Sequence, residues 1–230
     1  MSFDTSTPMN PQGRLAGKTV FITGAGSVGP GWGNGRAMAL RFAQEGASVY
    51  GVDRDAERLV ETSAMIEQIG GSFVAGTCDV TSGASIEQAI GACHERFGRL
   101  DVLVNNVGGS AKGGPVEMSE EVWDAQVDHN LKSVFLTCKH ALPLMLAQGS
   151  GNIINIASTS GIRWTGSAQI AYAATKAGVI QLSRVLAVQY AKQSIRVNTV
   201  VPGQLHTPMV EIRLAGQRAG GDVQALLEQR

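Results

Sequence analysis

A glycine-rich stretch near the start of the chain, Gly24 to Gly35, constrains the fold more than any other feature of the sequence. The β-branched run before it, residues 18–23, predicts a buried strand. The helical segment after it, residues 36–45, ends at Gly46, a residue typical of helix C-termini. Residues 47–53 predict a second strand. Strand, loop, helix and strand in this order indicate a βαβ unit of a parallel sheet.

The glycine loop and the acid that ends the second strand together predict a dinucleotide site. Glycines let the backbone approach a pyrophosphate, and the helix N-terminus supplies N–H donors and a positive dipole end. Asp53 lies 18 residues past Gly35, where a carboxylate that binds a ribose belongs. Taken alone, the loop is also compatible with a glycine-rich turn that binds nothing. An NTPase phosphate loop is disfavoured, because no Gly-Lys-Ser/Thr sequence follows.

The alternation of strands and helices continues through the chain. Further strands are predicted over residues 72–78, 100–105, 151–158 and 194–201, and helices over residues 55–69, 85–97, 119–146 and 166–192. We expect a bend in the 119–146 helix, where Pro143 should kink or cap its last part. The pattern predicts an α/β fold: a single doubly wound Rossmann domain, with a parallel sheet of six to seven strands and helices on both faces.

Composition supports one core and gives no sign of a charged partner. Of the 230 residues, 43% are hydrophobic and 17% are charged, and the net charge is zero. Neither nucleic acid nor a membrane surface is therefore expected as a partner. Residues 1–14 are polar, lack the apolar segment of a signal peptide, and are predicted to form a flexible lead-in. No apolar run is long enough to span a bilayer.

Cysteine and histidine spacing indicates neither disulfides nor a metal site. Cys78, Cys93 and Cys138 are odd in number and show no CxxC spacing, which predicts reduced thiols in a cytoplasmic protein. The histidines show no metal-ligand spacing. Of these, we expect His94, His129 and His140 on helix surfaces or in satisfied core positions.

Polar or glycine-containing residues follow each predicted strand. Because the carboxyl ends of parallel strands meet at one edge of a sheet, these residues should converge on one crevice. Besides the glycine loop they are Asp53, Asp79, residues 105–108, Ser158 and Pro202-Gly203. Each also has a purely structural interpretation. Asp53 suits a turn, Asp79 suits a helix N-cap, and Asn105 and Asn106 suit loop backbone.

The helix predicted over residues 166–192 carries a pair suited to proton transfer. Tyr172 and Lys176 are four residues apart and therefore share a helix face. A phenol normally ionises near pH 10, and a neighbouring ammonium lowers that pKa. Such pairs also arise by chance on solvated helices, so the pair gains its meaning from the rest of the chain.

Taken together, these motifs resemble the short-chain dehydrogenase/reductase family. The resemblance covers about residues 15–209, and residues 15–230 would form the Rossmann domain. The matching positions are Thr23-Gly24, Gly33-Asn34-Gly35, Asp79-Val80, Asn105-Asn106-Val107-Gly108, Asn130, Ser158, Tyr172, Lys176, Asn198, Pro202-Gly203 and Thr207.

The resemblance implies a catalytic role for four residues. Tyr172 would be the acid/base, and Lys176 would lower its pKa and hold the nicotinamide ribose. Ser158 would hydrogen-bond the substrate oxygen, although its neighbours Thr159 and Ser160 are alternatives. Asn130 would hold a water that links Lys176 to solvent, unless it only bends its helix. The implied reaction is hydride transfer between a nicotinamide cofactor and a secondary alcohol or ketone.

The implied cofactor is NAD, with NADP less favoured. A carboxylate at Asp53 accepts from the ribose 2′-OH and repels a 2′-phosphate, whereas the adjacent Arg54 could favour the phosphate. The family also implies a set of cofactor-binding positions around the cleft. They are Gly24, Ser27, Gly33, Asn34, Asp53, Arg54, Asp79, Val80, Asn106, Gly108, Tyr172, Lys176, Pro202, Gly203 and Thr207.

The chain departs from the family pattern in three places. About five residues, around 28–32, are inserted in the glycine loop, and Trp32 within them could fold over the cofactor or pack on the surface. Asn34 replaces an aliphatic residue between the last two glycines. The sequence ends at Arg230, so the domain is expected to lack the family's last helix and seventh strand.

The substrate is expected to be a small molecule that the sequence does not identify. Its contacts are expected from residues 109–116, residues 162–169 (including Arg163, Trp164 and Gln169) and the segment after Pro208. The family also implies a homotetramer or homodimer formed through the helices 119–146 and 166–192. Two alternatives are a catalytically silent dinucleotide sensor or scaffold, and a methyltransferase. A methyltransferase has no use for Tyr172 and Lys176 with Ser158, and a sensor has no reason to keep these three residues together with Asn130.

Overall fold

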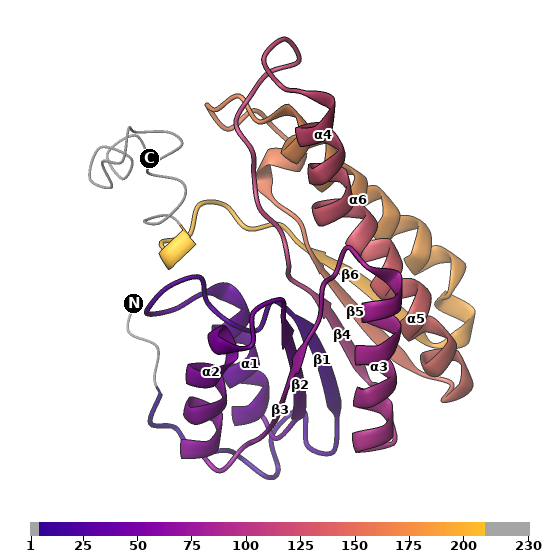
Figure 1. Cartoon of the computed structure of the whole chain (residues 1–230). Coiled ribbons are helices and arrows are strands. Elements are labelled where there is room, and N and C mark those ends of the chain that lie inside the picture. Colours follow the sequence, from indigo (N-terminus) through magenta and orange to yellow (C-terminus); the bar gives the residue numbers. More distant parts are fainter. Residues whose placement is uncertain (1–4, 210–230) are drawn as a thin grey trace.

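The computed structural model describes residues 5–209, which form one six-stranded parallel sheet in the order β3-β2-β1-β4-β5-β6 (Figure 1). This order is that of a doubly wound sheet, in which the chain winds outward from β1 first in one direction and then in the other. The predicted fold class is confirmed, with six strands in the described part of the chain. They are β1 Thr19–Thr23, β2 Ser48–Asp53, β3 Ser72–Thr77, β4 Val102–Asn105, β5 Gly151–Ile156 and β6 Ile195–Val200.

Helices connect the strands at the predicted places. They are α1 Asn34–Gln44, α2 Glu57–Gln68, α3 Gly83–Phe97, α4 Glu120–Val127, α5 Ser133–Ala147 and α6 Ile170–Gln189. Single turns of 3₁₀-helix lie at Thr159–Gly161 and Ala191–Gln193. Side chains cap two of the helices, because Ser82 accepts from Ser85 N at the start of α3 and Ser119 accepts from Val122 N at the start of α4.

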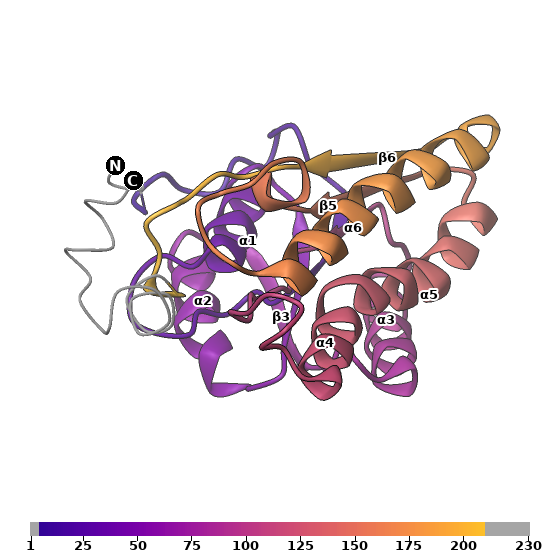
Figure 2. The same ribbon diagram turned by 90° about the horizontal axis from the view of Figure 1, so that it is seen from above.

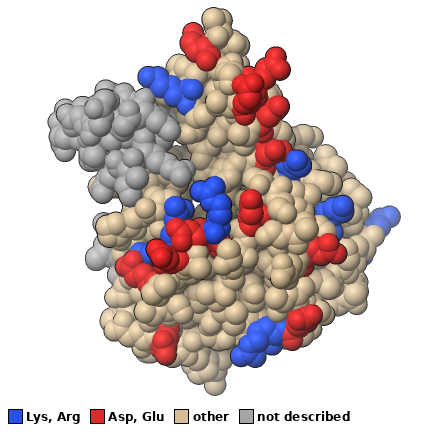
Figure 3. Space-filling model, viewed as in Figure 1, with Lys and Arg blue, Asp and Glu red and all other residues tan. Residues whose placement is uncertain are grey.

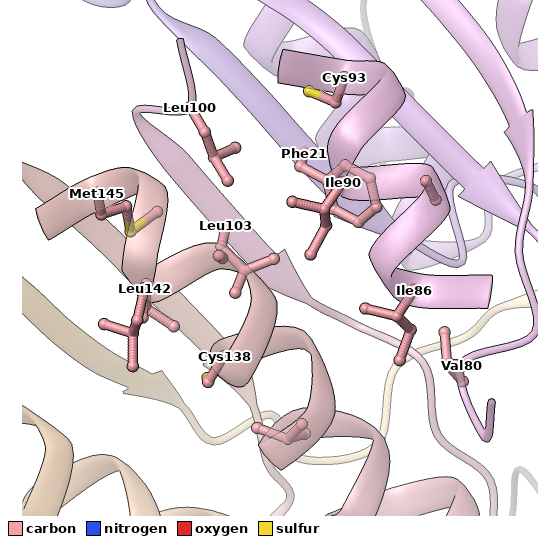
Figure 4. Close-up of a cluster of buried hydrophobic side chains, with 14 of the residues drawn as sticks. Phe21, Val80, Ile86, Ile90, Cys93, Leu100, Leu103, Cys138, Leu142 and Met145 are labelled. Carbon is pink, nitrogen blue, oxygen red and sulfur yellow. The ribbon is translucent and has the colours of Figure 1, made fainter. Parts of the chain in front are cut away.

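The two faces of the sheet bury separate hydrophobic clusters. On one face α1 and α2 pack against β1, β2 and β4, through Leu40, Leu59 and Ile66 among others. On the other face α3, α5 and α6 pack around Phe21, Leu103 and Ile153 (Figure 4). Figure 2 shows α1 and α2 gathered at one end of the molecule and α5 and α6 at the other. This double cover buries β1 and β4 over their whole length, whereas β3 and β6, at the two edges of the sheet, are partly exposed.

The segment predicted as a flexible lead-in is anchored over part of its length. Met9 N donates to Ile69 O, Asn10 N donates to Gln44 O, and Leu15 N donates to Glu45 O. Met9 also packs against the hydrophobic cluster beneath α1 and α2. Residues 9–15 therefore pack against the C-terminal ends of α1 and α2. The sequence did not predict this, because backbone groups make most of these bonds and leave no sequence pattern.

The helix predicted over residues 119–146 also differs in detail. Regular α geometry is interrupted at Asp128–Lys132, which form a π-helical turn between α4 and α5. Pro143, the expected kink or cap, lies inside α5, which continues to Ala147. The departure from regular geometry thus occurs around Asn130, next to the functional cleft, and not at the proline.

The surface carries no large field of one sign in the view of Figure 3, where acidic and basic side chains are interspersed. This agrees with the zero net charge of the sequence. Among residues 5–209, no helix combines the length and the apolar character needed to cross a membrane. The three thiols are buried and free of disulfides.

Candidate active site

A cleft of about 740 Å³ lies at the carboxyl ends of the strands. The residues that follow the strands, which the sequence predicted to converge at one edge of the sheet, line this cleft. The lining includes Gly24, Ser27, Gly33, Asn34, Asp53, Arg54, Asp79, Val80, Asn106, Gly108, Ser158, Tyr172, Lys176, Pro202, Gly203 and Thr207. Asn130 is the one predicted site residue that does not line it. The expectation of a single crevice is therefore met by the geometry.

The glycine loop turns so tightly that side chains are excluded at two points. Gly24 has φ +66°, a left-handed conformation that favours glycine. A Cβ at Gly35 would lie 1.7 Å from the carbonyl oxygen of Gly24. The start of α1 is thereby pressed against the end of β1, which places its first N–H groups at the cleft.

The same region fits the phosphates of a dinucleotide. No acidic residue occupies the first turn of α1, and its N-cap, Gly33, offers no side-chain bond to the first amides. The buried hydroxyl of Ser27 has no hydrogen-bond partner among the described residues and lies against Gly33. A donor of this kind beside a helix N-terminus suits an anionic ligand.

The end of β4 fastens the glycine loop in place. Asn106 Nδ2 donates to the carbonyls of Thr23 and Gly24 at 3.1 and 3.0 Å. The Thr23 hydroxyl in turn accepts from the backbone amides of Asn106 and Val107. Asn106 thus connects the ends of β1 and β4 and also lines the cleft.

Charges of both signs surround one end of the cleft. Asp53 ends β2 and lies 3.8 Å from Arg58, which also pairs with Asp55 at 3.4 Å. The Thr81 amide donates to the Asp79 carboxylate and is the main reason that the pKa of Asp79 lies below its usual value. The charge of the exposed Arg54 contributes less to this lowering. Sequence reasoning missed Arg58, which lies on α2 and is four residues beyond the motif residue Arg54.

Tyr172 and Lys176 lie in the first two turns of α6, on the face toward the cleft. Lys176 Nζ lies 5.8 Å from the centre of the Tyr172 ring and donates to Ile156 O at 2.8 Å. The Lys176 side chain is buried, and burial lowers the pKa of its ammonium to about 8. A Cβ at Gly108 would lie 2.9 Å from Nζ, so glycine at this position makes room for the lysine.

The hydroxyl groups that follow β5 differ in the hydrogen bonds that they make. Ser158 lines the cleft, and its Oγ accepts from Ser160 N at 3.2 Å. Ser160 and Thr165 are instead engaged by Gln169, whose Nε2 donates to both hydroxyls at 2.8 and 3.1 Å. The Ser158 proton is not used in either of these contacts. These bonds disfavour Ser160 as the ligand-binding hydroxyl, whereas Thr159 also lines the cleft, so the choice of Ser158 stays a prediction.

A chain of buried amides and hydroxyls supports this side of the cleft. Thr137 of α5 donates to Asn105 Oδ1, and Asn105 Nδ2 donates to Asn155 Oδ1 at 2.8 Å. Asn155 Nδ2 donates to Ser183 Oγ on α6 at 2.8 Å, and Ser183 donates to Val179 O. The chain joins α5, β4, β5 and α6 below Lys176. It fixes α6, which carries Tyr172 and Lys176, against β5, the strand that precedes Ser158.

Asn130 lies close to Lys176, since a Cβ at Gly108 would lie 2.9 Å from Lys176 Nζ and 3.2 Å from Asn130 Oδ1. It is fully buried in the π-helical turn, and its Oδ1 accepts from Gly109 N while its Nδ2 donates to Gly109 O and Gln126 Oε1. Gln126 Oε1 also accepts from Ala111 N. The side chain thus holds the loop after β4 at the edge of the cleft, and the role of Asn130 in holding a water stays a prediction.

Other lining residues were not selected from the sequence. His129 was expected on a helix surface or in the core, but it lines the cleft, as do Gln126 and Arg58. The π-helical turn brings His129 there, and no sequence signal marked that turn. Trp32 does not line the cleft; it is partly buried and packs against the hydrophobic cluster of α1 and α2.

The segments predicted to contact substrate lie side by side. Gly113 N donates to Ala168 O and Ile170 N donates to Gly113 O, which forms a short parallel bridge. A second cavity of about 340 Å³ lies between them, lined by Arg163 and Trp164 and sharing Ser160, Thr165 and Gln169 with the main cleft. Of the segment after Pro208, only Met209 is described, and it lines the main cleft.

The family model described as short chain dehydrogenase matches residues 18–217. Levodione reductase from Leifsonia aquatica is 42% identical over 205 residues, which cover 88% of this chain and 74% of the relative.

Solved structures agree with this family match. A short-chain dehydrogenase/reductase from Burkholderia xenovorans superposes with a TM-score of 0.91 at 55% identity, covering 95% of this chain and 82% of the other. Carveol dehydrogenase from Mycobacterium avium in complex with NAD gives a TM-score of 0.83 at 32% identity, with 90% and 79% covered. The chain belongs to the short-chain dehydrogenase/reductase family of oxidoreductases, whose members bind a nicotinamide cofactor.

Proposed function

We propose that this protein transfers a hydride between a nicotinamide cofactor, preferably NAD, and a secondary alcohol or ketone. The observation that carries the proposal is the placement of Tyr172, Lys176 and Ser158 in the same cleft as the glycine loop. A protein that only binds a dinucleotide has no need of this set. The bound cofactor would supply the hydride acceptor in oxidation and the hydride donor in reduction.

The protein's own groups would handle the proton. In the oxidation direction, the Tyr172 phenolate takes the proton from the substrate hydroxyl while Ser158 holds the same oxygen by a hydrogen bond. Lys176 is protonated below its lowered pKa of about 8, and its charge favours the phenolate. Asn130 is proposed to hold a water through which the proton leaves from Lys176 to solvent, and its side chain also orients the backbone of Gly109 at the edge of the cleft.

The preference for NAD rests on the end of β2. Asp53 is placed to accept from a ribose hydroxyl and to repel a 2′-phosphate. Arg54 and Arg58 line the same end of the cleft and reduce that repulsion, so we propose a preference and not an exclusion. The NAD complex of carveol dehydrogenase supports the same assignment by similarity.

The substrate would be a small molecule that enters beside the bridge between Gly113 and Gln169. Residues 109–116 and 162–169 are proposed as its contacts, since both segments border the cleft or the adjoining cavity. Two of the similar proteins are named for levodione reduction and carveol oxidation. We therefore expect alcohols and ketones of that general size in the substrate class.

Self-association through the outer helices is part of the proposal. Large apolar side chains are exposed on α4, α5 and α6, namely Trp123, Phe135, Val185 and Val188. Exposed apolar surface of this kind is typical of subunit interfaces. Light scattering on the purified protein would distinguish the expected dimer or tetramer from a monomer.

The direct test is cofactor-coupled absorbance with the purified protein. NAD would be offered with a panel of secondary alcohols, sugars and hydroxy acids, and NADH with the corresponding ketones. We expect turnover with at least one pair and its loss in Tyr172→Phe. NADH binding without turnover of any pair in either direction would contradict hydride transfer and favour a dinucleotide sensor.

A further inference from the structure

The glycine loop is held by a buried arginine that the catalytic scheme does not use. Arg36 lies in the first turn of α1 and is only 2% exposed. Its Nη1 donates to the carbonyl oxygen of Gly31 at 2.6 Å and pairs with Glu61 at 2.5 Å. Gly31 is one of the residues around 28–32 that are predicted to lengthen this loop beyond the usual family length. The arginine therefore bonds directly to the predicted insertion.

A second bond connects the same arginine to the other arm of the loop. Arg36 Nε donates to Thr62 Oγ1 at 3.2 Å, and the Thr62 hydroxyl donates to Ala25 O at 3.0 Å. Ala25 follows β1 directly, whereas Gly31 lies near the start of α1. Arg36 and Thr62 therefore connect the beginning and the end of the loop to α2.

Burial of a guanidinium is costly unless its charge is paired and its donors are used. Glu61 supplies the charge, but its side chain is about half exposed, which makes the pair a weak reason to bury the arginine. The two other hydrogen bonds of Arg36 go to Gly31 O in the loop and to the Thr62 hydroxyl, which bonds Ala25 O of the same loop. The network is therefore arranged to fix loop backbone.

The part of the loop that it fixes faces the cleft. Gly26, Ser27 and Val28 lie between the two attached carbonyls, and all three line the cleft. A long glycine-rich loop has large conformational freedom, and ordering it on ligand binding reduces affinity. A loop that is already ordered avoids this cost.

We propose that Arg36 and Thr62 are positioning residues that hold the extended glycine loop in its cofactor-binding conformation before the cofactor arrives. The proposal rests on the proposed binding of a nicotinamide dinucleotide. Arg36 and Thr62 do not line the cleft. They should therefore change cofactor affinity and leave the chemical step at saturating cofactor nearly unaltered.

The test compares Arg36→Ala and Thr62→Val with Thr62→Ser and Glu61→Gln. Thr62→Val removes the bonding hydroxyl at nearly constant volume, and Thr62→Ser keeps it. Binding of NADH would be measured by fluorescence titration, kcat at saturating NADH by absorbance, and hydrogen exchange of residues 24–35 by mass spectrometry on the protein without cofactor.

For Arg36→Ala and Thr62→Val we expect NADH dissociation constants raised about tenfold, the equivalent of one hydrogen bond of about 1.4 kcal/mol. Their kcat should stay within about twofold of wild type, and exchange should accelerate in residues 24–35 while that of β4 and β5 is unchanged. Thr62→Ser and Glu61→Gln should resemble the wild type in all three measurements.

Wild-type affinity and wild-type loop exchange in Thr62→Val would overturn the proposal, whatever Arg36→Ala does. Faster exchange throughout both Arg36→Ala and Thr62→Val would also overturn it, since it would assign the network to global stability alone. If the wild type binds no NADH, the proposed function fails, but the exchange measurement still shows whether Arg36 and Thr62 order the loop.

Discussion

The two halves of the cleft are ordered by different means. On the catalytic side, regular elements carry the functional groups, and buried side chains such as Asn105, Asn155 and Ser183 join those elements to one another. On the cofactor side, loop backbone shaped by Gly24 and Gly35 forms the functional surface. Arg36 and Thr62 attach this loop to α2. The contrast suggests that side chains which do chemistry need rigid supports, whereas a phosphate site needs close backbone approach.

The largest expected difference between the halves concerns Lys176 and pH. Burial lowers its pKa from 10.5 to about 8, so between these values the unfolded chain binds more protons than the folded one. The free energy of unfolding should therefore rise with pH through this window, by an amount on the order of 3 kcal/mol relative to Lys176→Met. Denaturant unfolding of both proteins at pH 7.5 to 10.5 (about 0.5 steps) would measure it.

Parallel pH profiles of wild type and Lys176→Met would contradict this account of the lysine. The neighbouring cofactor side offers a control, because Arg36→Lys changes a buried cation outside the catalytic side. It should not remove the pH-dependent rise that Lys176 causes.

Gly35→Ala should damage the cofactor side alone. Its added methyl group would meet Gly24 O at 1.7 Å, and overpacking of this kind typically costs about 1–3 kcal/mol. If the loop moves to relieve the contact, NADH affinity should fall about tenfold or more. Gly91→Ala in α3 is the matched control, since a Cβ there meets no atom within 4 Å. It should leave affinity unchanged and add up to about 1 kcal/mol of stability.

Asn155→Ala should damage the catalytic side instead. It leaves Asn105 and Ser183 without their shared partner, which should lower the free energy of unfolding by about 1–3 kcal/mol and reduce kcat more than NADH affinity. Asn152→Ala, on the same strand, removes an amide whose buried Oδ1 has no partner among the described residues. Equal losses in both variants, measured by denaturant unfolding, would argue against the network.

Asp53→Asn should have the smallest effect and a selective one. Loss of the carboxylate charge should lower the preference for NADH over NADPH about tenfold, measured as the ratio of kcat/KM values. Asp55→Asn changes a carboxylate that pairs with the same Arg58 but does not line the cleft, so its ratio should stay near that of wild type. An unchanged ratio in Asp53→Asn would move the basis of cofactor choice to the arginines.

The sequence predicted the fold well because its signals are local. Strand-like runs of four to six residues separated by helical periods predict a parallel sheet, and the polar residues after the runs, from Asp53 to Pro202, meet at one edge. Tyr172 and Lys176 could be placed together because their spacing on a helix fixes their mutual position.

What the sequence did not predict depends on contacts between distant segments. Asn130 lies in a π-helical turn and bonds to Gly109, 21 residues earlier in the chain, a contact that no local pattern encodes. The contact of Arg36 with Gly31 and Thr62 likewise requires α1 and α2 to be packed. The anchoring of Met9 and Asn10 rests on backbone bonds that any residues would supply and on the packing of Met9 against a cluster that exists only in the folded chain.

The division of labour between the two halves can be tested in one paired measurement. The NADH dissociation constant and the rate of hydride transfer in a single turnover at saturating NADH would be determined for Tyr172→Phe and Thr62→Val. We predict a crossed result: Tyr172→Phe loses about 100-fold or more in rate with affinity retained, and Thr62→Val loses affinity with rate retained. A Tyr172→Phe enzyme that transfers hydride at the wild-type rate would contradict the central claim, that this tyrosine is the acid/base of a dehydrogenase.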